Sequence, residues 1–255
     1  MALTAGIVGL PNVGKSTLFN AITKAGALAA NYPFATIDPN VGIVEVPDSR
    51  LNKLAEMVQP KKTIPTTFEF TDIAGIVKGA SKGEGLGNKF LSHIREVDAI
   101  CQVVRAFDDD NVTHVSGRVD PVDDIEVINM ELVLADLESV EKRLPKAEKM
   151  AKQKDKDAVN EARILARIKE ALEEGNPVRS LEFNDEDQKF VNQAQLLTSK
   201  EMLYIANVGE DEIGDEDNEK VKLIREYASK EDSEVIVISA KIEEEVSALD
   251  VETRK

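Results

Sequence analysis

Cysteine and long apolar runs are scarce in this chain of 255 residues. Cys101 is the single cysteine, which excludes a disulfide partner within the chain and fits a reducing, cytoplasmic compartment. No apolar run reaches the roughly 18 residues needed to span a bilayer, and no basic residues precede the short apolar stretch at the N-terminus. We therefore expect a cytoplasmic protein with no membrane partner.

Acidic residues outnumber basic ones, 48 to 32. The formal net charge is -16, so nucleic-acid phosphates should repel the molecule as a whole. The exception is the segment 142–156, which holds seven basic and two acidic residues, a local charge of +5. This segment favours a local contact with RNA. Because no aromatic residue is interleaved for stacking on bases, a solvated helix face is the alternative.

Strands should alternate with helices along most of the chain. With 42% apolar residues, the chain can bury a substantial core. Short apolar or β-branched runs predict strands at residues 3–8, 42–46, 67–71, 99–106, 202–206 and 235–238. Helical segments between them predict an α/β fold, in which a mostly parallel sheet carries helices on both faces.

Residues 129–199 depart from that alternation, because they show helical periodicity and no strand. Two apolar stripes occur there, one formed by Met130, Val133, Leu137, Val140 and Leu144 and one by Ala158, Ala162, Leu165, Ile168 and Leu172. Gly175-Asn-Pro ends the second helix. A third helix begins at Asn184 or Asp185 and runs to about residue 199.

We expect the first two of these helices to pair as an antiparallel hairpin or coiled coil. The hairpin would occupy residues 129–199 and would interrupt an α/β domain made of residues 1–128 and 200–255. The alternative is a helical layer that covers the core. The narrow apolar stripes and the charged segment near the tip favour a protruding hairpin.

The segment 9–16 reads Gly-Leu-Pro-Asn-Val-Gly-Lys-Ser and matches G-x-x-x-x-G-K-[ST] between a predicted strand and a predicted helix. In such a P-loop, successive main-chain N–H groups face the phosphates of a nucleotide, here those of Asn12, Val13, Gly14, Lys15, Ser16 and Thr17. Lys15 would bridge the β- and γ-phosphates, and the Ser16 hydroxyl would bind Mg²⁺. A chance match is the alternative, and the strand–turn–helix context argues against it.

Asp72-Ile-Ala-Gly75 follows the strand predicted at 67–71. A carboxylate at the end of such a strand belongs to the Mg²⁺ shell, usually through water. Gly75 has no side chain, so its N–H can approach the γ-phosphate closely. Thr36, in the loop between the two motifs, could supply a second hydroxyl to Mg²⁺, or it could be an ordinary loop threonine.

Asn207-Val208-Gly-Glu210 and Ser239-Ala240-Lys follow the next two strands, where GTPases carry N-K-x-D and S-A-K. In GTPases the aspartate accepts hydrogen bonds from the N1–H and N2 amine of guanine. Glu210 is longer by one methylene, so guanine would lose a well-placed partner, whereas adenine has neither donor. We expect adenine, with the Asn207 amide available to it. A GTPase that accepts glutamate for aspartate is the alternative.

The chain resembles the YchF/Obg-like ATPase family in five segments. These are the P-loop, the Asn-Tyr-Pro-Phe-Ala-Thr segment ending at Thr36, the Asp72-Ile-Ala-Gly-Ile-Val-Lys-Gly segment and the two altered base motifs. The likeness covers essentially the whole chain. It implies an Obg-related protein that binds ATP at least as well as GTP, carries a helical hairpin and associates with ribosomes or ribosomal RNA. Family members also carry a C-terminal TGS domain, and this chain stops at Lys255 on the approach to it, which implies a fragment.

The residue after the D-x-x-G motif is Ile76, where many GTPases have a glutamine that orients the attacking water. His114 is one candidate for that role, since imidazole can orient or deprotonate water near neutral pH; a structural or solvated loop histidine is the alternative. Asn12 could help to bind K⁺, a second candidate cofactor beside Mg²⁺. We interpret His93, in a predicted helix, as a packing residue.

The glycines at 79, 83, 85 and 87 suit a switch segment beyond the γ-phosphate contact. We therefore expect a slow, Mg²⁺-dependent ATPase that acts as a ribosome-associated switch. A conventional GTPase and a non-catalytic nucleotide sensor are the alternatives, and the sensor is favoured by isoleucine in the place of the glutamine.

Overall fold

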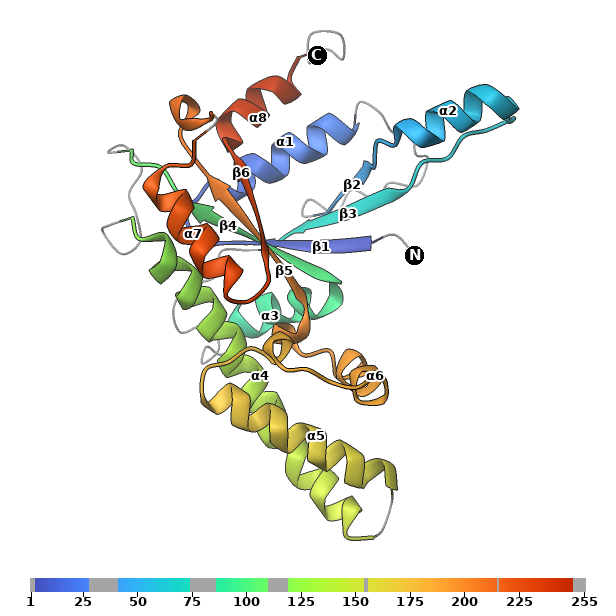
Figure 1. The fold of residues 1–255 in the computed structure, drawn as a ribbon, viewed down its shortest axis with the longest axis vertical. Coiled ribbons are helices and arrows are strands. Elements are labelled where there is room, and N and C mark those ends of the chain that lie inside the picture. Colours follow the sequence, from blue (N-terminus) through green and yellow to red (C-terminus); the bar gives the residue numbers. More distant parts are fainter. Residues whose placement is uncertain are drawn as a thin grey trace.

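The computed structural model describes residues 3–27, 41–73, 86–109, 119–153, 156–214 and 216–249. Within them, one six-stranded sheet has the order β2-β3-β1-β4-β5-β6 (Figure 1). Its strands are β1 (Leu3–Val8), β2 (Val41–Glu45), β3 (Thr67–Asp72), β4 (Ala99–Arg105), β5 (Glu201–Asn207) and β6 (Glu234–Ile238). Only β2 runs antiparallel to its neighbour in this sheet, so the predicted mostly parallel sheet is confirmed.

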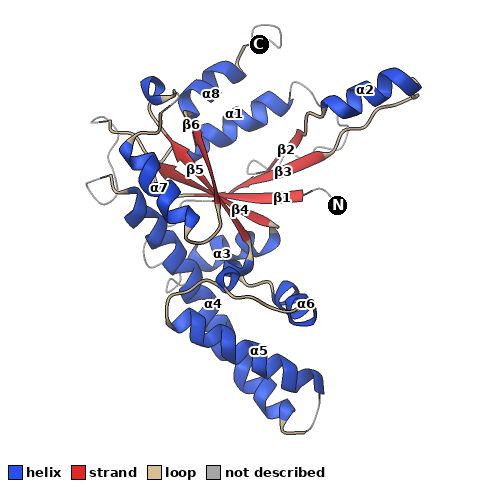
Figure 2. Cartoon of the chain, in the orientation of Figure 1, coloured by secondary structure: helices blue, strands red, loops and turns tan. Residues whose placement is uncertain are grey.

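Helices cover both faces of the sheet, as predicted (Figures 1 and 2). They are α1 (Lys15–Ala27), α2 (Ser49–Val58), α3 (Leu86–Glu96), α4 (Pro121–Ala151), α5 (Lys156–Glu173), α6 (Asp185–Ala194), α7 (Glu219–Ser229) and α8 (Ala240–Ser247). Short 3₁₀ turns occupy Val178–Ser180, Leu197–Ser199 and Glu210–Glu212. Helices α1 and α8 lie together on one face of the sheet, and α3, α4 and α7 lie on the other.

Parallel pairing brings the carboxyl ends of the strands to one edge of the sheet. Ile7 near the end of β1 is in register with Asp72 at the end of β3. On the other side, Arg105 is in register with Asn207, and Asn207 with Ile238. The loops that follow these strands therefore start at the same edge, which is where open α/β sheets bind their ligands.

Helix α4 belongs to two apolar clusters. Asp120 caps its N-terminus and Pro121 stands at the first helical position. The early turns pack Ile125, Ile128 and Leu132 into the core of the sheet. Later turns pack against α5, with Val140 among the buried residues. The helix therefore starts earlier than residue 129 and continues without a break from the sheet into the hairpin.

Helices α4 and α5 form the antiparallel hairpin predicted from the sequence, and it projects away from the sheet (Figure 1). Leu165, Ile168 and Leu172 are buried along its seam, and the chain turns after α5 at Gly175, which has φ 85°. The prediction for Met130 is wrong, because its side chain is 47% exposed. A Cβ atom built on Gly175 would lie 3.8 Å from Cε of Met130, so α5 has already ended at this level of the seam.

The buried Asp136 of α4 fastens the exit of the hairpin to the sheet domain. Its carboxylate accepts hydrogen bonds from the main-chain N–H groups of Leu197 (2.9 Å) and Thr198 (2.8 Å). These bonds hold the chain in a 3₁₀ turn. The third helix consequently ends at Ala194 and not near residue 199, and Gln195 after it adopts a left-handed conformation with φ 52°.

Helix α2 was not predicted from the sequence. Asp48 caps it, and it stands out from the body of the molecule with no buried residue (Figure 1). Leu54, Met57 and Val58 are exposed along it. Because none of its residues is buried in the core, the sequence shows no pattern of buried apolar positions from which this helix could be predicted.

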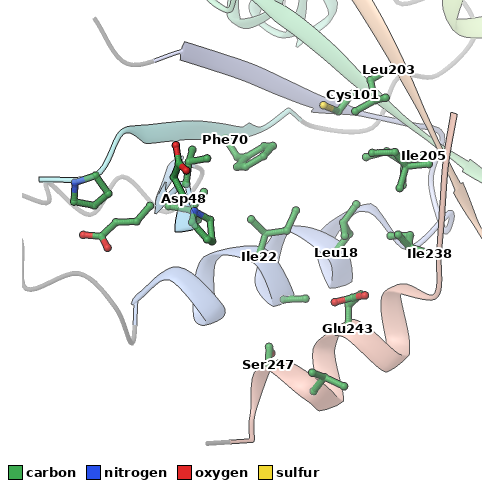
Figure 3. A pocket seen from close by; sticks show the side chains of 18 of the residues that line it. Leu18, Ile22, Asp48, Phe70, Cys101, Leu203, Ile205, Ile238, Glu243 and Ser247 are labelled. Carbon is green, nitrogen blue, oxygen red and sulfur yellow. The ribbon is translucent and has the colours of Figure 1, made fainter. Parts of the chain in front are cut away.

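An apolar cavity of about 960 Å³ lies between α1, α8 and the sheet (Figure 3). Leu18, Phe70 and Ile205 are among the residues that line it, and so is Cys101. Burial raises the pKa of the Cys101 thiol to about 11. Of the residues assigned to a site from the sequence, none that the structure describes lines this cavity.

Candidate functional site

The turn between β1 and α1 curls back on itself. Asn12 and Gly14 adopt left-handed backbone conformations, with φ 64° and 92°, and α1 begins directly afterwards at Lys15. A Cβ atom on Gly14 would lie 2.2 Å from Nδ2 of Asn207, so a larger residue would be both strained and obstructed. Such a curl before a helix N-terminus directs main-chain N–H groups and the positive end of the helix dipole at one point, the requirement for binding phosphate.

Lys15 and Asp72 meet beside this turn. The Lys15 ammonium forms an ion pair with Oδ1 of Asp72, and the two side chains are only 10% and 17% exposed. The pairing follows from the sheet, since β1 and β3 are neighbours and Asp72 is the last residue of β3. In GTPase-type proteins these two positions contact the phosphates and the Mg²⁺ shell.

The residues at this edge fit Mg²⁺ held together with a phosphate. Ser16 is exposed in the first turn of α1, and Asp72 offers a carboxylate at the end of β3. Mg²⁺ takes oxygen ligands and is commonly held by one or two side chains, several waters and substrate phosphates. The described residues contain no cluster of three or more His, Cys, Asp or Glu residues that would form a metal cage from protein alone.

Asn207 joins two of the strand-end loops through its buried side-chain amide. Its Nδ2 donates to the carbonyl of Val13 in the P-loop, and its Oδ1 accepts from the main-chain N–H of Ala240, both at 2.9 Å. The oxygen is therefore engaged within the protein, while Nδ2 keeps one further hydrogen. This hydrogen suits N7, an acceptor common to adenine and guanine, so the Asn207 amide is available to adenine, as expected, without distinguishing the two bases.

A cavity of about 870 Å³ opens where the loops meet. It brings together most of the residues predicted to bind the nucleotide: Asn12, Gly14, Thr17, Asn207, Val208, Glu210, Ser239 and Ala240. Of the remaining predictions, Val13 is tied to this edge through Asn207, and Lys15, Ser16 and Asp72 stand beside it. Thr36, Gly75, Ile76 and His114 lie outside the described residues.

Glu210 is paired across the loops with Lys241. The lysine ammonium donates to Oε1 of Glu210, and this hydrogen bond raises the pKa of Lys241. Both side chains are exposed to solvent at the cavity wall. One oxygen of the carboxylate that would have to receive two donors from guanine therefore already accepts from a neighbouring cation.

Phe107, Asp108 and Asp109 also line the cavity, and sequence reasoning missed them. They follow β4, the one parallel strand in this part of the sheet to which no motif had been assigned. The signal was present, because a loop after a parallel strand between two site-bearing strands must lie at the same edge. Phe107 is the one aromatic residue among those that line the cavity in the described part of the chain.

Two further observations bear on the sequence predictions. His93 lies in the last turn of α3 and is exposed, so its interpretation as a packing residue is wrong. The last turn of a helix has some side chains that point to solvent and some that point to the core. The sequence periodicity did not show to which group His93 belongs. Within the described residues, no helix has the length and apolar character that crossing a membrane requires.

These loops, gathered at the carboxyl edge of a mostly parallel sheet around a P-loop, define a P-loop NTPase of the GTPase type. Comparison with known sequences narrows this class. The model of the family described as 50S ribosome-binding GTPase matches residues 4–134. The chain is 71% identical over 256 residues to the ribosome-binding ATPase YchF of Bacillus subtilis and 54% identical over 254 residues to that of Escherichia coli O157:H7.

Both alignments cover 100% of this chain, and 70% and 69% of those two proteins. A solved structure, that of the Schizosaccharomyces pombe YchF GTPase, superimposes with a TM-score of 0.86 at 40% identity, covering 99% of this chain and 69% of that one. The chain therefore belongs to the YchF family, as its motifs predicted.

Proposed function

We propose that the chain binds ATP with Mg²⁺, hydrolyses it slowly to ADP and phosphate, and acts as a ribosome-associated switch in the cytoplasm. The observation that carries the proposal is the contact between Lys15 and Asp72 beside the curled turn, because it places a phosphate-binding cation and a Mg²⁺-binding carboxylate together. Residues 1–128 and 200–255 would form the nucleotide domain, and residues 129–199 the inserted hairpin.

The site residues then take the following roles. The N–H groups from Asn12 to Thr17 hold the phosphates, Lys15 neutralises charge on the β- and γ-phosphates, and Ser16 and Asp72 hold Mg²⁺. The metal supplies charge neutralisation on the phosphate oxygens when it is bound. Water attacks the γ-phosphorus and the bond to the β–γ bridging oxygen breaks.

We propose four further roles for residues or ions for which the described part of the structure gives no contact. Thr36 supplies a second hydroxyl to Mg²⁺, and the Gly75 N–H contacts the γ-phosphate. His114 orients the water, and K⁺ binds near Asn12.

Substitution of His114 by alanine should lower turnover and leave nucleotide affinity nearly intact; equal turnover would remove His114 from the mechanism.

Adenine is the preferred base because of how Glu210 is held. Guanine needs a carboxylate that can accept from N1–H and N2 together, and Glu210 is both longer than aspartate and paired with Lys241. Adenine has an acceptor at N1 and does not need this carboxylate. The names of the relatives divide on the point: the Bacillus protein is called an ATPase and the S. pombe protein a GTPase.

The double variant Glu210→Asp with Lys241→Ala tests this assignment of the base. It shortens the acid and removes its partner, so the ratio of GTP to ATP affinity should rise at least tenfold over wild type, measured by isothermal titration with Mg²⁺. Glu216→Asp, at an exposed position beyond this turn, is the matched control for shortening a glutamate. An unchanged ratio in the double variant would contradict the role given to Glu210.

Single-turnover phosphate release tests whether the chain is an enzyme or only a sensor. Wild type should release phosphate from ATP faster than Lys15→Ala, with and without K⁺ and ribosomes. A wild-type rate no faster than that of Lys15→Ala would favour the non-catalytic sensor, the second candidate.

Association with the ribosome follows from the relatives, which are named ribosome-binding ATPases. We assign the contact with ribosomal RNA to the hairpin tip. Near the end of α4, Lys146, Lys149 and Lys152 are exposed, whereas Lys142 pairs with Glu138 farther down the helix. Exposed lysines that are not paired can neutralise RNA phosphates and release counterions.

Reversing the three exposed charges to glutamate should weaken co-sedimentation with ribosomes at least tenfold and reduce its dependence on salt. The matched control reverses three exposed lysines on or near α2, Lys53, Lys61 and Lys62. Because the control changes net charge equally, equal losses in the two variants would show a non-specific effect of charge and contradict the assignment to the tip.

A further inference from the structure

Arg105, the last residue of β4, is among the largest fully buried side chains of the protein, with 1% of it exposed. A guanidinium is rarely buried to this degree, because removing a charge from water is costly unless hydrogen bonds replace the lost hydration. The mechanism proposed above gives Arg105 no task. Its contacts therefore need an explanation of their own.

Two of its hydrogen bonds run to the short loop that follows β4. Nε of Arg105 donates to the carbonyl of Phe107 (3.2 Å), and a terminal nitrogen donates to the carbonyl of Asp109 (3.1 Å). The guanidinium carbon also lies 4.5 Å from the centroid of the Phe107 ring, within the range of a cation–π interaction. One side chain thus fixes both the backbone of this loop and the ring that the loop carries.

Phe107 belongs to the cavity in which the base motifs meet. It lines the cavity together with Asn207 and Val208, and the residue is half-buried, so it is not closed off from a ligand. Aromatic faces stack on purines regardless of which base is present. A ring fixed here is suited to pack against the base and not to choose between adenine and guanine.

We propose that Arg105 is a positioning residue that holds Phe107 as a preformed wall for the purine base. The inference rests on the proposed nucleotide site and extends it to a residue that contacts no nucleotide. A wall that is ordered before binding spares the ligand the entropic cost of ordering it. Arg105 therefore acts on affinity for the base and leaves the phosphate contacts alone.

The loop has other tethers, so its path should survive the loss of the guanidinium. The side-chain amide of Asn218 donates to the carbonyl of Ala106 (3.0 Å), and Lys220 pairs with Asp108 (2.6 Å). Both tethers come from the N-terminal end of α7. In the described part of the chain, Arg105 is the cation that lies over the Phe107 ring, and this separates its role from theirs.

Binding of two ligands, ATP and inorganic tripolyphosphate, tests the base half and the phosphate half of the site separately. In the full chain, Arg105→Lys should weaken ATP binding about tenfold and inorganic tripolyphosphate binding less than twofold, measured by isothermal titration with Mg²⁺. In steady-state hydrolysis KM should rise while kcat changes less than twofold. Arg179→Lys is the matched control: Arg179 is a nearly buried arginine paired with Glu231 and does not line the nucleotide cavity, so both ligands should bind it as they bind wild type.

A double-variant cycle tests whether Arg105 acts through the ring. Phe107→Leu should weaken ATP about as much as Arg105→Lys does, and the variant carrying both changes should be no weaker than either alone. Independent, additive losses would overturn the proposal. So would equal losses for ATP and tripolyphosphate, or no loss for either.

If the Arg105 variants fail to fold, the proposal can still be tested on a protein that keeps Arg105. With 4-fluorophenylalanine at Phe107, ¹⁹F NMR of the nucleotide-free protein should show one narrow resonance displaced from that of the unfolded chain. A resonance at the unfolded position would overturn the preformed wall. If wild type bound neither ATP nor tripolyphosphate, the proposed nucleotide function itself would fail.

Discussion

Replacing Asn207 by alanine should damage both stability and nucleotide binding, because one amide holds two loops. In wild type the Asn207 side chain satisfies the carbonyl of Val13 and the N–H of Ala240, both in buried residues. Alanine would leave both main-chain groups without this partner. The P-loop would also lose its tie to the loop after β6.

A buried group left without its hydrogen-bond partner costs about 1–3 kcal/mol. Two such groups, with partial relaxation of the loops, should lower the free energy of unfolding by about 2–4 kcal/mol. This is a large share of the roughly 5–15 kcal/mol that stabilises a typical domain. Because the curl of the P-loop is no longer fixed, ATP affinity should also fall at least tenfold.

Urea unfolding followed by far-ultraviolet circular dichroism measures the first effect. The midpoint should fall and the slope should stay unchanged, since the same surface is exposed on unfolding. Asn207→Asp is an informative companion, because it keeps an acceptor for Ala240 but sets a carboxylate oxygen against the carbonyl of Val13. Its stability loss relative to wild type should shrink as the pH falls and the carboxyl becomes protonated. An Asn207→Ala midpoint equal to that of wild type would refute the reasoning.

Three shorter predictions follow. Gly14→Ala should abolish measurable ATP binding, because its Cβ would stand 2.2 Å from Nδ2 of Asn207 in a left-handed conformation; titration checks this, and wild-type affinity would contradict it. Asp136→Ala should lower the free energy of unfolding by about 2–4 kcal/mol in urea, since it strips two buried main-chain donors, whereas a surface aspartate such as Asp157 should cost under about 0.5 kcal/mol. Iodoacetamide at pH 8 should label Cys101 only as the protein unfolds, because burial raises its folded pKa to about 11; labelling should quicken as the pH rises toward that value, and rapid labelling of native protein at pH 8 would contradict this.

The phosphate half of the site could be predicted from the sequence because its information is local. Glycine at position 14, the lysine after it and an aspartate closing a β-branched run each report a backbone geometry or a strand end. Lys15 and Asp72 then come together because β1 and β3 are neighbouring parallel strands. The strands themselves were placed within about two residues for the same reason, since short apolar runs reveal buried parallel strands.

The base half of the site depends on tertiary contacts that no short pattern encodes. Phe107 has no motif of its own and acquires its place from the sheet order and from Arg105. Asn207 matched a motif, but the partners of its amide come from residues 194 and 33 positions away. The ends of the helices failed similarly: α6 stops at Ala194 because Asp136, in another helix, fixes the chain beyond it.

Helix α2 shows a different limit. Three of its apolar residues, Leu54, Met57 and Val58, are exposed and none is buried, so the rule that apolar periodicity marks a buried face does not hold for it. His93 is the polar counterpart, a residue assigned to packing that lies in solvent. No helix was predicted for α2, and for His93 the helix was predicted but its exposure was not; only the packed structure decides which side chains are covered.

Titration of the wild-type chain with ATP and with GTP, each with Mg²⁺, tests the central claim most directly, because base identity defines what kind of NTPase this is. The account predicts that ATP binds at least as tightly as GTP, because Glu210 is longer than aspartate and pairs with Lys241 through Oε1. GTP binding tenfold tighter than ATP would contradict it.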